Sequence, residues 1–258
     1  MFAKIMTFNL RQNVESDGDN AWPYRTTAVA EVIRRHDADI IGIQEGLHDM
    51  LMDLEPLLPE YAWIGEGREG GDKGEYTAIF YKKSKWSAGN SGHFSLSETP
   101  EQLGVKSWNT SHTRMCSWVT LKSQTGSEFA AFNTHLDHIS DEAQQKGMEL
   151  IRARIKEFRD QTGLPVVLTG DFNVYPEHAV ITGLEREGYR NAYSVLHQEN
   201  QEVGATVHHF LGGESGEPID YIFVSPDLQI HQLRVDRELY EGRYPSDHYP
   251  VIAEVSPL

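Results

Sequence analysis

The chain has 258 residues, of which 39% are hydrophobic, and its 39 acidic against 23 basic residues give a formal net charge of −16. This length and hydrophobic content suit a domain with a sizeable core, and we expect one domain over residues 1–258 because no linker, repeat or low-complexity segment divides the chain. A chain this acidic is poorly suited to gripping long duplex DNA, which proteins hold mainly through basic faces.

In the first half of the chain, short apolar runs alternate with two amphipathic segments. The run Phe2–Phe8 is apolar on both faces, as in a strand inside a sandwich. An apolar stripe at helical spacing predicts a helix over Ala21–Arg35. A second buried strand, Asp39–Gln44, is followed by an expected helix over Leu47–Leu58, which Pro59 ends. Further strands are expected at Tyr61–Ile64, Thr77–Tyr81, Met115–Leu121 and Glu128–Thr134.

The clearest helix of the sequence lies in the second half. Ser140 is a suitable N-cap, two carboxylates follow it at the positive end of the helix dipole, and an apolar face continues to Asp160. The remaining strands are expected at Pro165–Leu168, Ile219–Val224, Gln229–Val235 and Tyr249–Val255. Short strands with a few long helices between them predict an α/β fold, a four-layered α/β sandwich of two packed, mainly antiparallel sheets flanked by helices.

Polar clusters follow, or nearly follow, these predicted strands. They are Thr7-Phe8-Asn9, Gln44-Glu45, Asn133-Thr-His-Leu-Asp-His138, Gly170-Asp-Phe-Asn173, and Asp220 with Ser246-Asp247-His248. If the strand ends meet, these carboxylates, amides and imidazoles are delivered to one place. Without thiols, they form the ligand set of a hard divalent cation such as Mg²⁺ or Mn²⁺. A pocket of this kind suits metal-assisted attack of water on a phosphoester.

Taken together and in this order, from Asn9 to His248, the clusters resemble the endonuclease/exonuclease/phosphatase superfamily, whose fold is that of deoxyribonuclease I. Its members include abasic-site endonucleases, inositol-polyphosphate 5-phosphatases, sphingomyelinases and nocturnin-type deadenylases. The stretches Gly74–Tyr81, Leu96–Pro100 and Asn133–His138 are most similar to a bacterial branch of metal-dependent hydrolases. The resemblance implies a metal-dependent phosphoric ester hydrolase.

The resemblance also implies roles for individual residues. Glu45 is implied as the ligand of Mg²⁺ or Mn²⁺, assisted directly or through water by Asn9 and Asp247; a buried strand that ends on a charge agrees with this. Asp171 is implied to orient or deprotonate the attacking water, and Asn173 to contact the scissile phosphate. An Asx turn at these two residues is compatible with that role.

Two imidazoles and one arginine are implied to contact the phosphate. His135 and His248 would donate to its oxygens, where charge builds up in the transition state. Asp220 is implied as the partner that fixes the tautomer of His248. Arg114 precedes a predicted strand and would suit the substrate phosphate, although a salt bridge at the rim is the alternative.

Two loops are candidates for contacts with the rest of the substrate. Gly65–Gly74 is rich in glycine but does not connect a strand to a helix, so it is not a P-loop. We interpret it as a surface loop whose end, Glu75-Tyr76, could border the pocket. In Thr206–Gly213, Phe210 or His208 could stack on a base or sugar ring, and a plain packing role for Phe210 is equally open.

The leading functional hypothesis is Mg²⁺- or Mn²⁺-dependent hydrolysis of a phosphodiester or phosphomonoester in a small or single-stranded phosphorylated substrate. The main alternative is a nuclease of the exonuclease or deadenylase type acting on RNA or DNA, which would need a basic groove beside Arg114. A catalytically inactive binding module would need a gap in the polar set, and the sequence shows none. No apolar stretch approaches the roughly 20 residues of a membrane helix, so we expect no membrane partner. With no signal peptide before the first strand, we expect a cytoplasmic location; the oligomeric state is open.

Overall fold

The computed structural model describes residues 3–198 and 201–258, so Phe2, the expected start of the first strand, lies outside the described residues. The strands are β1 (Ala3–Asn9), β2 (Ile40–Gln44), β3 (Tyr61–Ile64), β4 (Ile79–Lys82), β5 (Trp86–Ser95), β6 (Met115–Ser123), β7 (Glu128–His135), β8 (Val166–Asp171), β9 (Arg190–Asn191), β10 (Asp220–Val224), β11 (Leu228–Val235) and β12 (Val251–Pro257). The helices are α1 (Thr26–His36), α2 (His48–Leu54), α3 (Asp141–Thr162), α4 (Ala179–Arg186) and α5 (Ser194–Gln198), with 3-10 turns η1 (Glu15–Asn20) and η2 (Trp22–Tyr24) before α1.

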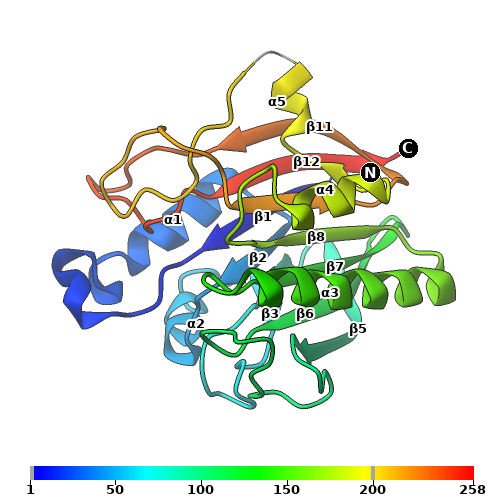
Figure 1. The fold of residues 1–258 in the computed structure, drawn as a ribbon. Helices are drawn as coiled ribbons and strands as arrows, with labels where there is room; N and C mark the ends of the chain where they lie inside the picture. Colours follow the sequence, from blue (N-terminus) through cyan, green and yellow to red (C-terminus); the bar gives the residue numbers. More distant parts are fainter. Residues whose placement is uncertain (1–2, 199–200) are drawn as a thin grey trace.

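These strands form two six-stranded sheets, in the orders β11-β12-β1-β2-β4-β3 and β5-β6-β7-β8-β10-β9. Among the described strands, only β1 with β2 and β7 with β8 run parallel, and the other neighbours are antiparallel. Helices α1 and α2 pack on the outer face of the first sheet, and α3 and α4 cover the outer face of the second (Figure 1). The predicted four-layered α/β sandwich with mainly antiparallel sheets is confirmed.

Alternation along the central strands divides their side chains between two cores. In β1, Ile5 belongs to the core that both sheets share, whereas Met6 and Phe8 face the helices on the outside. In β2, Ile40 and Ile41 are divided in the same way. Because both faces are covered, these strands carry continuous apolar runs and were predictable as buried strands.

Several elements differ from the sequence-based expectation, and α4, α5 and β9 lie where no helix or strand is expected. The segment Ala21–Arg35 begins as the 3-10 turn η2, which contains Pro23, and the α-helix itself starts only at Thr26. The expected helix Leu47–Leu58 ends earlier, since α2 stops at Leu54. The sequence does not predict β5, an edge strand that is largely exposed along its middle and has no apolar run. Of the helices within the described ranges, none combines the length and the apolar composition that crossing a bilayer requires.

A layer of polar side chains lies inside the sandwich, below the strand ends. Gln44 Nε2 donates to Asn133 Oδ1 at 2.7 Å and to Thr7 Oγ1 at 3.1 Å. Thr169 Oγ1 donates to the same Asn133 oxygen at 3.1 Å. Gly42 makes room for this contact, because a Cβ atom there would lie 2.1 Å from Thr169 Oγ1. The layer therefore connects the two sheets directly through hydrogen bonds.

Candidate active site

The two parallel strand pairs end at one edge of the sandwich, and their registers place the polar clusters side by side. In the first sheet the ends of β1 and β2 pair with each other, so that Glu45 follows beside Asn9. In the second sheet Asp171 at the end of β8 pairs with His135 of β7 on one side and with Asp220 of β10 on the other. Paired residues project their side chains to the same face of a sheet. Strand register thus assembles this part of the site.

Asn9 joins the two sheets at this edge. Its Nδ2 donates to Glu45 Oε1 at 3.1 Å and to Asp171 Oδ2 at 3.0 Å, while its Oδ1 accepts the backbone N–H of Arg11 at 2.9 Å. Burial opposes the ionisation of Glu45, but hydrogen bonds from the backbone N–H of Gln12 and from Asn9 lower its pKa below the ordinary value. Glu45 also adopts the left-handed backbone conformation, with φ 60°, which a non-glycine residue keeps only where its surroundings enforce it.

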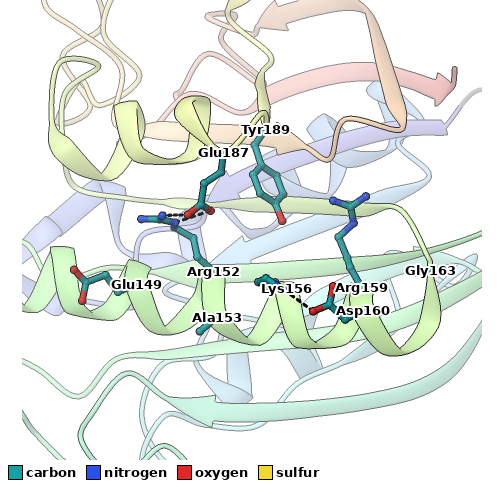
Figure 2. Close-up of a pocket in the computed structure, with 9 residues that line it drawn as sticks. All are labelled: Glu149, Arg152, Ala153, Lys156, Arg159, Asp160, Gly163, Glu187 and Tyr189. Carbon is teal, nitrogen blue, oxygen red and sulfur yellow. Dashed lines mark hydrogen bonds and ion pairs between the residues drawn. The ribbon is translucent and has the colours of Figure 1, made fainter.

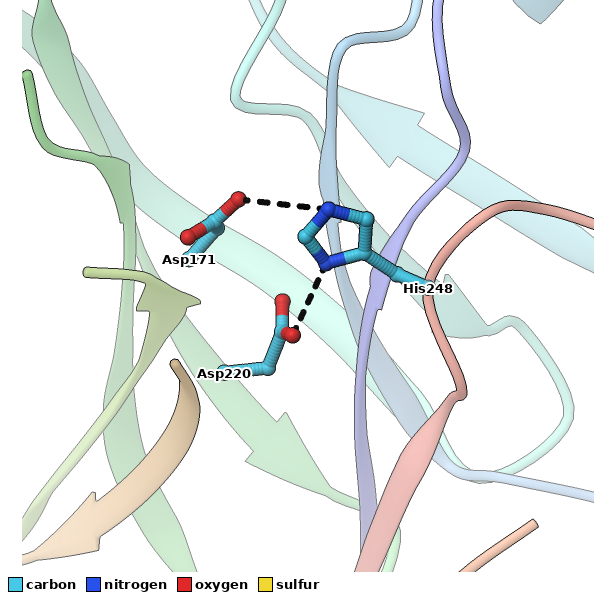
Figure 3. A group of neighbouring side chains, drawn as sticks. All are labelled: Asp171, Asp220 and His248. Atoms are coloured by element: carbon cyan, nitrogen blue, oxygen red, sulfur yellow. Dashed lines mark hydrogen bonds and ion pairs between the residues drawn. The ribbon is translucent and has the colours of Figure 1, made fainter. Parts of the chain in front are cut away.

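His248 lies between two carboxylates, as Figure 3 shows. Its Nδ1 is 2.9 Å from Asp220 Oδ2, and its Nε2 is 3.9 Å from Asp171 Oδ2. Burial favours the neutral ring, but the charges of Asp220 and Asp171 outweigh it and raise the pKa of His248 well above its ordinary value. The ring is therefore held as an imidazolium whose Nε2 faces Asp171.

Asp171 is the central carboxyl group of the site. Burial, followed by the charge of Asp220, raises its pKa to about 7. Its Oδ1 accepts the backbone N–H of Asn173 at 3.0 Å, which forms the Asx turn compatible with the prediction, and its Oδ2 accepts from Asn9. The side chain of Asn173 in turn donates to the carbonyl of Leu136 at 3.1 Å. A carboxyl group with a pKa near neutrality is suited to take a proton from water and release it again.

On the other side of Asp171, His135 begins a cluster of charged residues. His135 Nε2 lies 3.5 Å from Asp171 Oδ2, and its Nδ1 lies 3.8 Å from Glu75 Oε2. Burial, followed by the charges of Arg114 and Arg68, lowers the pKa of His135 well below its ordinary value, so this ring is neutral. The same Glu75 oxygen is 2.7 Å from Arg68 and 3.5 Å from Arg114. Arg114 thus lies beside the site in a buried ion pair with Glu75. Glu75 was expected only at the border of the pocket.

A buried arginine that the sequence analysis missed holds the loops that carry the site. Arg25 is fully buried, and its guanidinium donates to backbone carbonyls of residues 10–12 and to that of Pro245. It therefore ties the loop after β1 to the loop before β12. Ser246 Oγ adds a second connection by donating to the carbonyl of Asn9 at 2.6 Å. No local pattern marks Arg25, because its partners are backbone groups distant in sequence.

The remaining predicted residues surround this centre. Asp247 precedes His248 and adds to the negative charge around that imidazole. His208 is buried and stacks on the ring of Tyr249, with the two centroids 3.9 Å apart. Phe210 is half-buried and has a positive φ of 62°. The substrate contacts expected of His208 and Phe210 stay predictions.

A surface groove of about 780 Å³ lies elsewhere, along α3 (Figure 2). Figure 2 shows Arg152 of this groove turned toward Glu187, and Lys156 toward Asp160. Lys156 Nζ is 2.5 Å from the Asp160 carboxylate. Because these two cations, and Arg159 with Asp227, are already paired with neighbouring carboxylates, the size of the groove does not make it a phosphate site.

The fold and the polar edge point to one family. The sequence profile of the Endonuclease/Exonuclease/phosphatase family matches residues 6–248. The chain belongs to this family. Members of the Endonuclease/Exonuclease/phosphatase family hydrolyse phosphoesters, and the chain is a hydrolase of this kind. The resemblance on which the sequence analysis relied is therefore confirmed.

Similar solved structures agree with this assignment. A mannosyl-6-phosphatase of Bacteroides thetaiotaomicron VPI-5482 is 35% identical, covers 98% of this chain and 99% of that one, and gives a TM-score of 0.92. A family protein of Bacteroides thetaiotaomicron is 34% identical over 99% of this chain and 98% of its own, with a TM-score of 0.91. The human Nocturnin catalytic domain with bound sulfate anion, 20% identical over 100% of this chain and 94% of its own, shares the fold with a TM-score of 0.80. No curated protein matches the chain.

Proposed function

We propose that the chain catalyses the Mg²⁺- or Mn²⁺-dependent hydrolysis of a phosphoester in a small or single-stranded phosphorylated substrate. The observation that carries this proposal is the continuous row of polar groups that runs from Glu45 through Asn9 and Asp171 to His248 and Asp220. The row supplies a carboxylate for a cation, a carboxyl group suited to act as a base, and an imidazolium suited to stabilise negative charge. These are the groups that hydrolysis by an activated water needs.

The donor set of the row fits a hard divalent cation. It offers carboxylate and amide oxygens, and Asp220 Oδ1 is buried without a hydrogen-bond partner among the residues that the structure describes. Asp171, Asp220 and His248 could place ligand atoms within 4.8 Å of one another. Since His248 Nδ1 is already bonded to Asp220, Glu45 is the carboxylate proposed to hold the cation. Asn9 turns its Nδ2 to Glu45 and its Oδ1 to the N–H of Arg11, so it would contact the cation through water. When bound, the cation would stabilise charge on the phosphate and favour deprotonation of water.

In the proposed mechanism, the chain's own residues place the water and move its proton. Asp171, held by N–H groups of Asn9 and Asn173, orients the water and accepts its proton. The oxygen of the water forms a bond to phosphorus while the bond from phosphorus to the leaving oxygen breaks, and this oxygen leaves as an alkoxide that takes a proton from solvent. His248, kept protonated by Asp220, donates from Nε2 to an oxygen of the phosphate, where negative charge builds up.

A substrate panel tests this proposal. A relative named as a mannosyl-6-phosphatase supports a small phosphorylated substrate, so the panel contains a hexose 6-phosphate, inositol phosphates, chromogenic phosphate mono- and diesters, and short RNA and DNA. We expect hydrolysis of at least one small ester with Mg²⁺ or Mn²⁺, loss of activity with EDTA, and recovery when the metal is returned. If no compound of the panel is hydrolysed with either metal, the proposal is contradicted.

Glu45→Gln is expected to weaken the apparent affinity for the metal, because a neutral amide replaces the carboxylate proposed as its ligand. Activity should recover in part at high Mn²⁺ concentration. The measurement is a titration of activity against Mg²⁺ and Mn²⁺, with binding followed independently by calorimetry. Glu149→Gln is the matched control, since Glu149 lies exposed on α3. An unchanged metal titration would remove Glu45 from the ligand set.

The strongly acidic balance of the chain leads to a second expectation, about substrate size. An enzyme that grips several phosphates of a single strand loses affinity with salt, at a log–log slope of roughly −0.7 for each neutralised phosphate. Here only a few cations, among them Arg11, Arg68 and Arg114, lie near the row, so kcat/KM should fall weakly with salt at fixed Mg²⁺. A mono- or dinucleotide-sized ester should also be hydrolysed about as well as a longer one. A steep salt dependence, or a strong gain with length, would favour the nuclease alternative.

A further inference from the structure

Two exposed imidazoles lie beside the site and have no part in the proposed mechanism. The rings of His112 and His138 are stacked, with their centroids 5.6 Å apart and their planes inclined by 17°. His138 Nδ1 lies 3.3 Å from Nη2 of Arg114. Because a guanidinium can only donate, this Nδ1 is the acceptor and the proton of the ring is on Nε2. These two residues, the imidazole pair, therefore adjoin the arginine that is expected on the substrate phosphate.

The imidazole pair has hydrogen-bonding groups to offer. Nε2 of His138 and both ring nitrogens of His112 bond to no residue in the described part of the chain. Burial, followed by the charges of Arg68 and Arg114, lowers the pKa of His112, so this ring is neutral at neutral pH. A neutral imidazole has one N–H donor and one nitrogen acceptor. His112 thus presents a donor and an acceptor without adding positive charge, and His138 adds a second donor.

One buried carboxylate holds the two loops that carry the imidazole pair. Asp137 is only 1% exposed. Its Oδ1 accepts the N–H and the hydroxyl of Ser111, next to His112, at 3.0 and 2.6 Å. Its Oδ2 accepts the N–H of Ile139, next to His138, at 3.1 Å. The backbone beside each imidazole is therefore fixed before a ligand arrives, and this lowers the entropy that binding would cost.

We infer that the imidazole pair binds hydroxyl groups of a sugar, and that the substrate is a sugar phosphate. The inference rests on the proposed function. Arg114 lies between the pair and Glu75, and Glu75 is 3.8 Å from His135. A sugar esterified to a phosphate at the row can therefore extend past Arg114 to the pair.

The chemistry of the imidazole pair favours a sugar over a nucleobase. A hydroxyl group both donates and accepts, which matches the N–H groups and the free ring nitrogen of the pair. A nucleobase binds mainly by stacking on a free aromatic face. In the pair each ring covers one face of the other, so the ring edges with their nitrogen atoms are the main groups on offer.

The first test compares primary phosphate esters with and without hydroxyl groups. The sugar esters are hexose 6-phosphates and ribose 5-phosphate. Cyclohexylmethyl phosphate has a six-membered ring and the same type of ester bond but no hydroxyl group. We expect kcat/KM for the best sugar ester to be at least about 10²-fold higher, since a site that hydrogen-bonds a hydroxyl group rejects an analogue that lacks it.

Two results of this comparison would overturn the inference and leave the proposed function standing. One is equal hydrolysis of the sugar esters and cyclohexylmethyl phosphate. The other is faster hydrolysis of adenosine 5′-monophosphate than of every sugar ester, which would indicate that a base is recognised. If no sugar ester is hydrolysed while another compound of the panel is, the inference also fails.

His112→Phe connects the preference to the imidazole pair. Phenylalanine keeps a flat ring for the stack but has no nitrogen, so kcat/KM for the best sugar ester should fall about tenfold, as expected for one or two lost hydrogen bonds. Hydrolysis of cyclohexylmethyl phosphate should not change. His231→Phe is the matched control, because His231 lies on β11 at the edge of the first sheet. Equal losses for both esters would indicate a structural role of His112, and no loss for either would exclude its contact with the sugar.

Inhibition provides a measurement that does not depend on turnover of a sugar ester. The phosphonate isosteres of the best sugar ester and of cyclohexylmethyl phosphate have a carbon in place of the ester oxygen and are not hydrolysed. We expect the sugar phosphonate to inhibit competitively at a concentration at least about tenfold lower than the cyclohexyl compound, and His112→Phe to remove most of this difference. Equal inhibition of the wild-type enzyme by the two compounds would show that it does not bind the hydroxyl groups.

Discussion

Asp171→Asn is expected to lower kcat by about 10²–10⁴-fold, the contribution typical of a positioned general base, while metal affinity changes little. The amide preserves the size of the side chain but cannot accept a proton from water. Single-turnover and steady-state hydrolysis of the best panel substrate measure kcat, and calorimetry with Mn²⁺ measures binding. Because Asp171 lies outside the ligand set proposed around Glu45, the two measurements should separate.

The control for this substitution is Asp160→Asn. Asp160 is an exposed carboxylate on α3 that pairs with Lys156, and the same chemical change there should leave turnover and unfolding unaltered. Turnover of the Asp171 variant within tenfold of the wild type would exclude Asp171 as the base. A parallel loss of metal binding would instead place Asp171 among the ligands of the cation.

His248→Ala is expected to reduce kcat/KM by about 10²–10⁴-fold, because it removes the imidazolium that faces the phosphate. Asp220→Asn should cause a smaller loss in the same direction. The imidazole remains in that variant, but the amide neither fixes its orientation nor raises its pKa as the carboxylate does. The measurement is kcat/KM for both variants on the same ester at fixed Mg²⁺.

The double variant decides whether His248 and Asp220 act as a pair. Once His248 is absent, the Asp220 carboxylate has no imidazole to orient, so the double variant should be little worse than His248→Ala alone. Losses that multiply in full would show that the hydrogen bond of 2.9 Å between the two side chains has no functional meaning. Far-ultraviolet circular dichroism of the three variants checks that each one remains folded.

The strands and the polar residues that end them were predictable from the sequence for a physical reason. A strand covered on both faces needs a continuous apolar run, so a polar residue such as Asn9, Glu45 or Asp171 at its end stands out. Strand β5 shows the limit of this signal. It lies at the edge of a sheet with many exposed side chains, and its polar sequence resembles that of a loop.

The contacts within the site depend on information that a local pattern does not contain. Only strand register shows that His135 and Asp220 flank Asp171. Arg25 and Arg68 resemble ordinary surface arginines in sequence, yet Arg25 is fully buried because backbone carbonyls from separate loops surround it. Glu75 was placed only at the border of the pocket, since its partners come from another strand and another loop. Ion pairs of this kind are decided by tertiary packing.

The polar layer inside the sandwich offers a further expectation about stability. Asn133→Ala removes the acceptor of Gln44 Nε2 and of Thr169 Oγ1. A buried polar group left without its partner costs roughly 1–3 kcal/mol, so the free energy of unfolding should fall by about that amount. Denaturant unfolding measures it. An unchanged free energy of unfolding would mean that the layer does not hold the sheets together.

The polar layer also determines how the two sheets are aligned with each other. Aliphatic side chains pack almost as well after one sheet slides along the other, since dispersion forces have little directionality. The hydrogen bonds from Gln44 Nε2 and Thr169 Oγ1 to Asn133 depend on distance and direction, so such a displacement would break them inside the sandwich. These hydrogen bonds therefore fix the position of one sheet relative to the other, between faces that are otherwise apolar. The distance from Asn9 on one sheet to Asp171 on the other depends on this alignment of the two sheets.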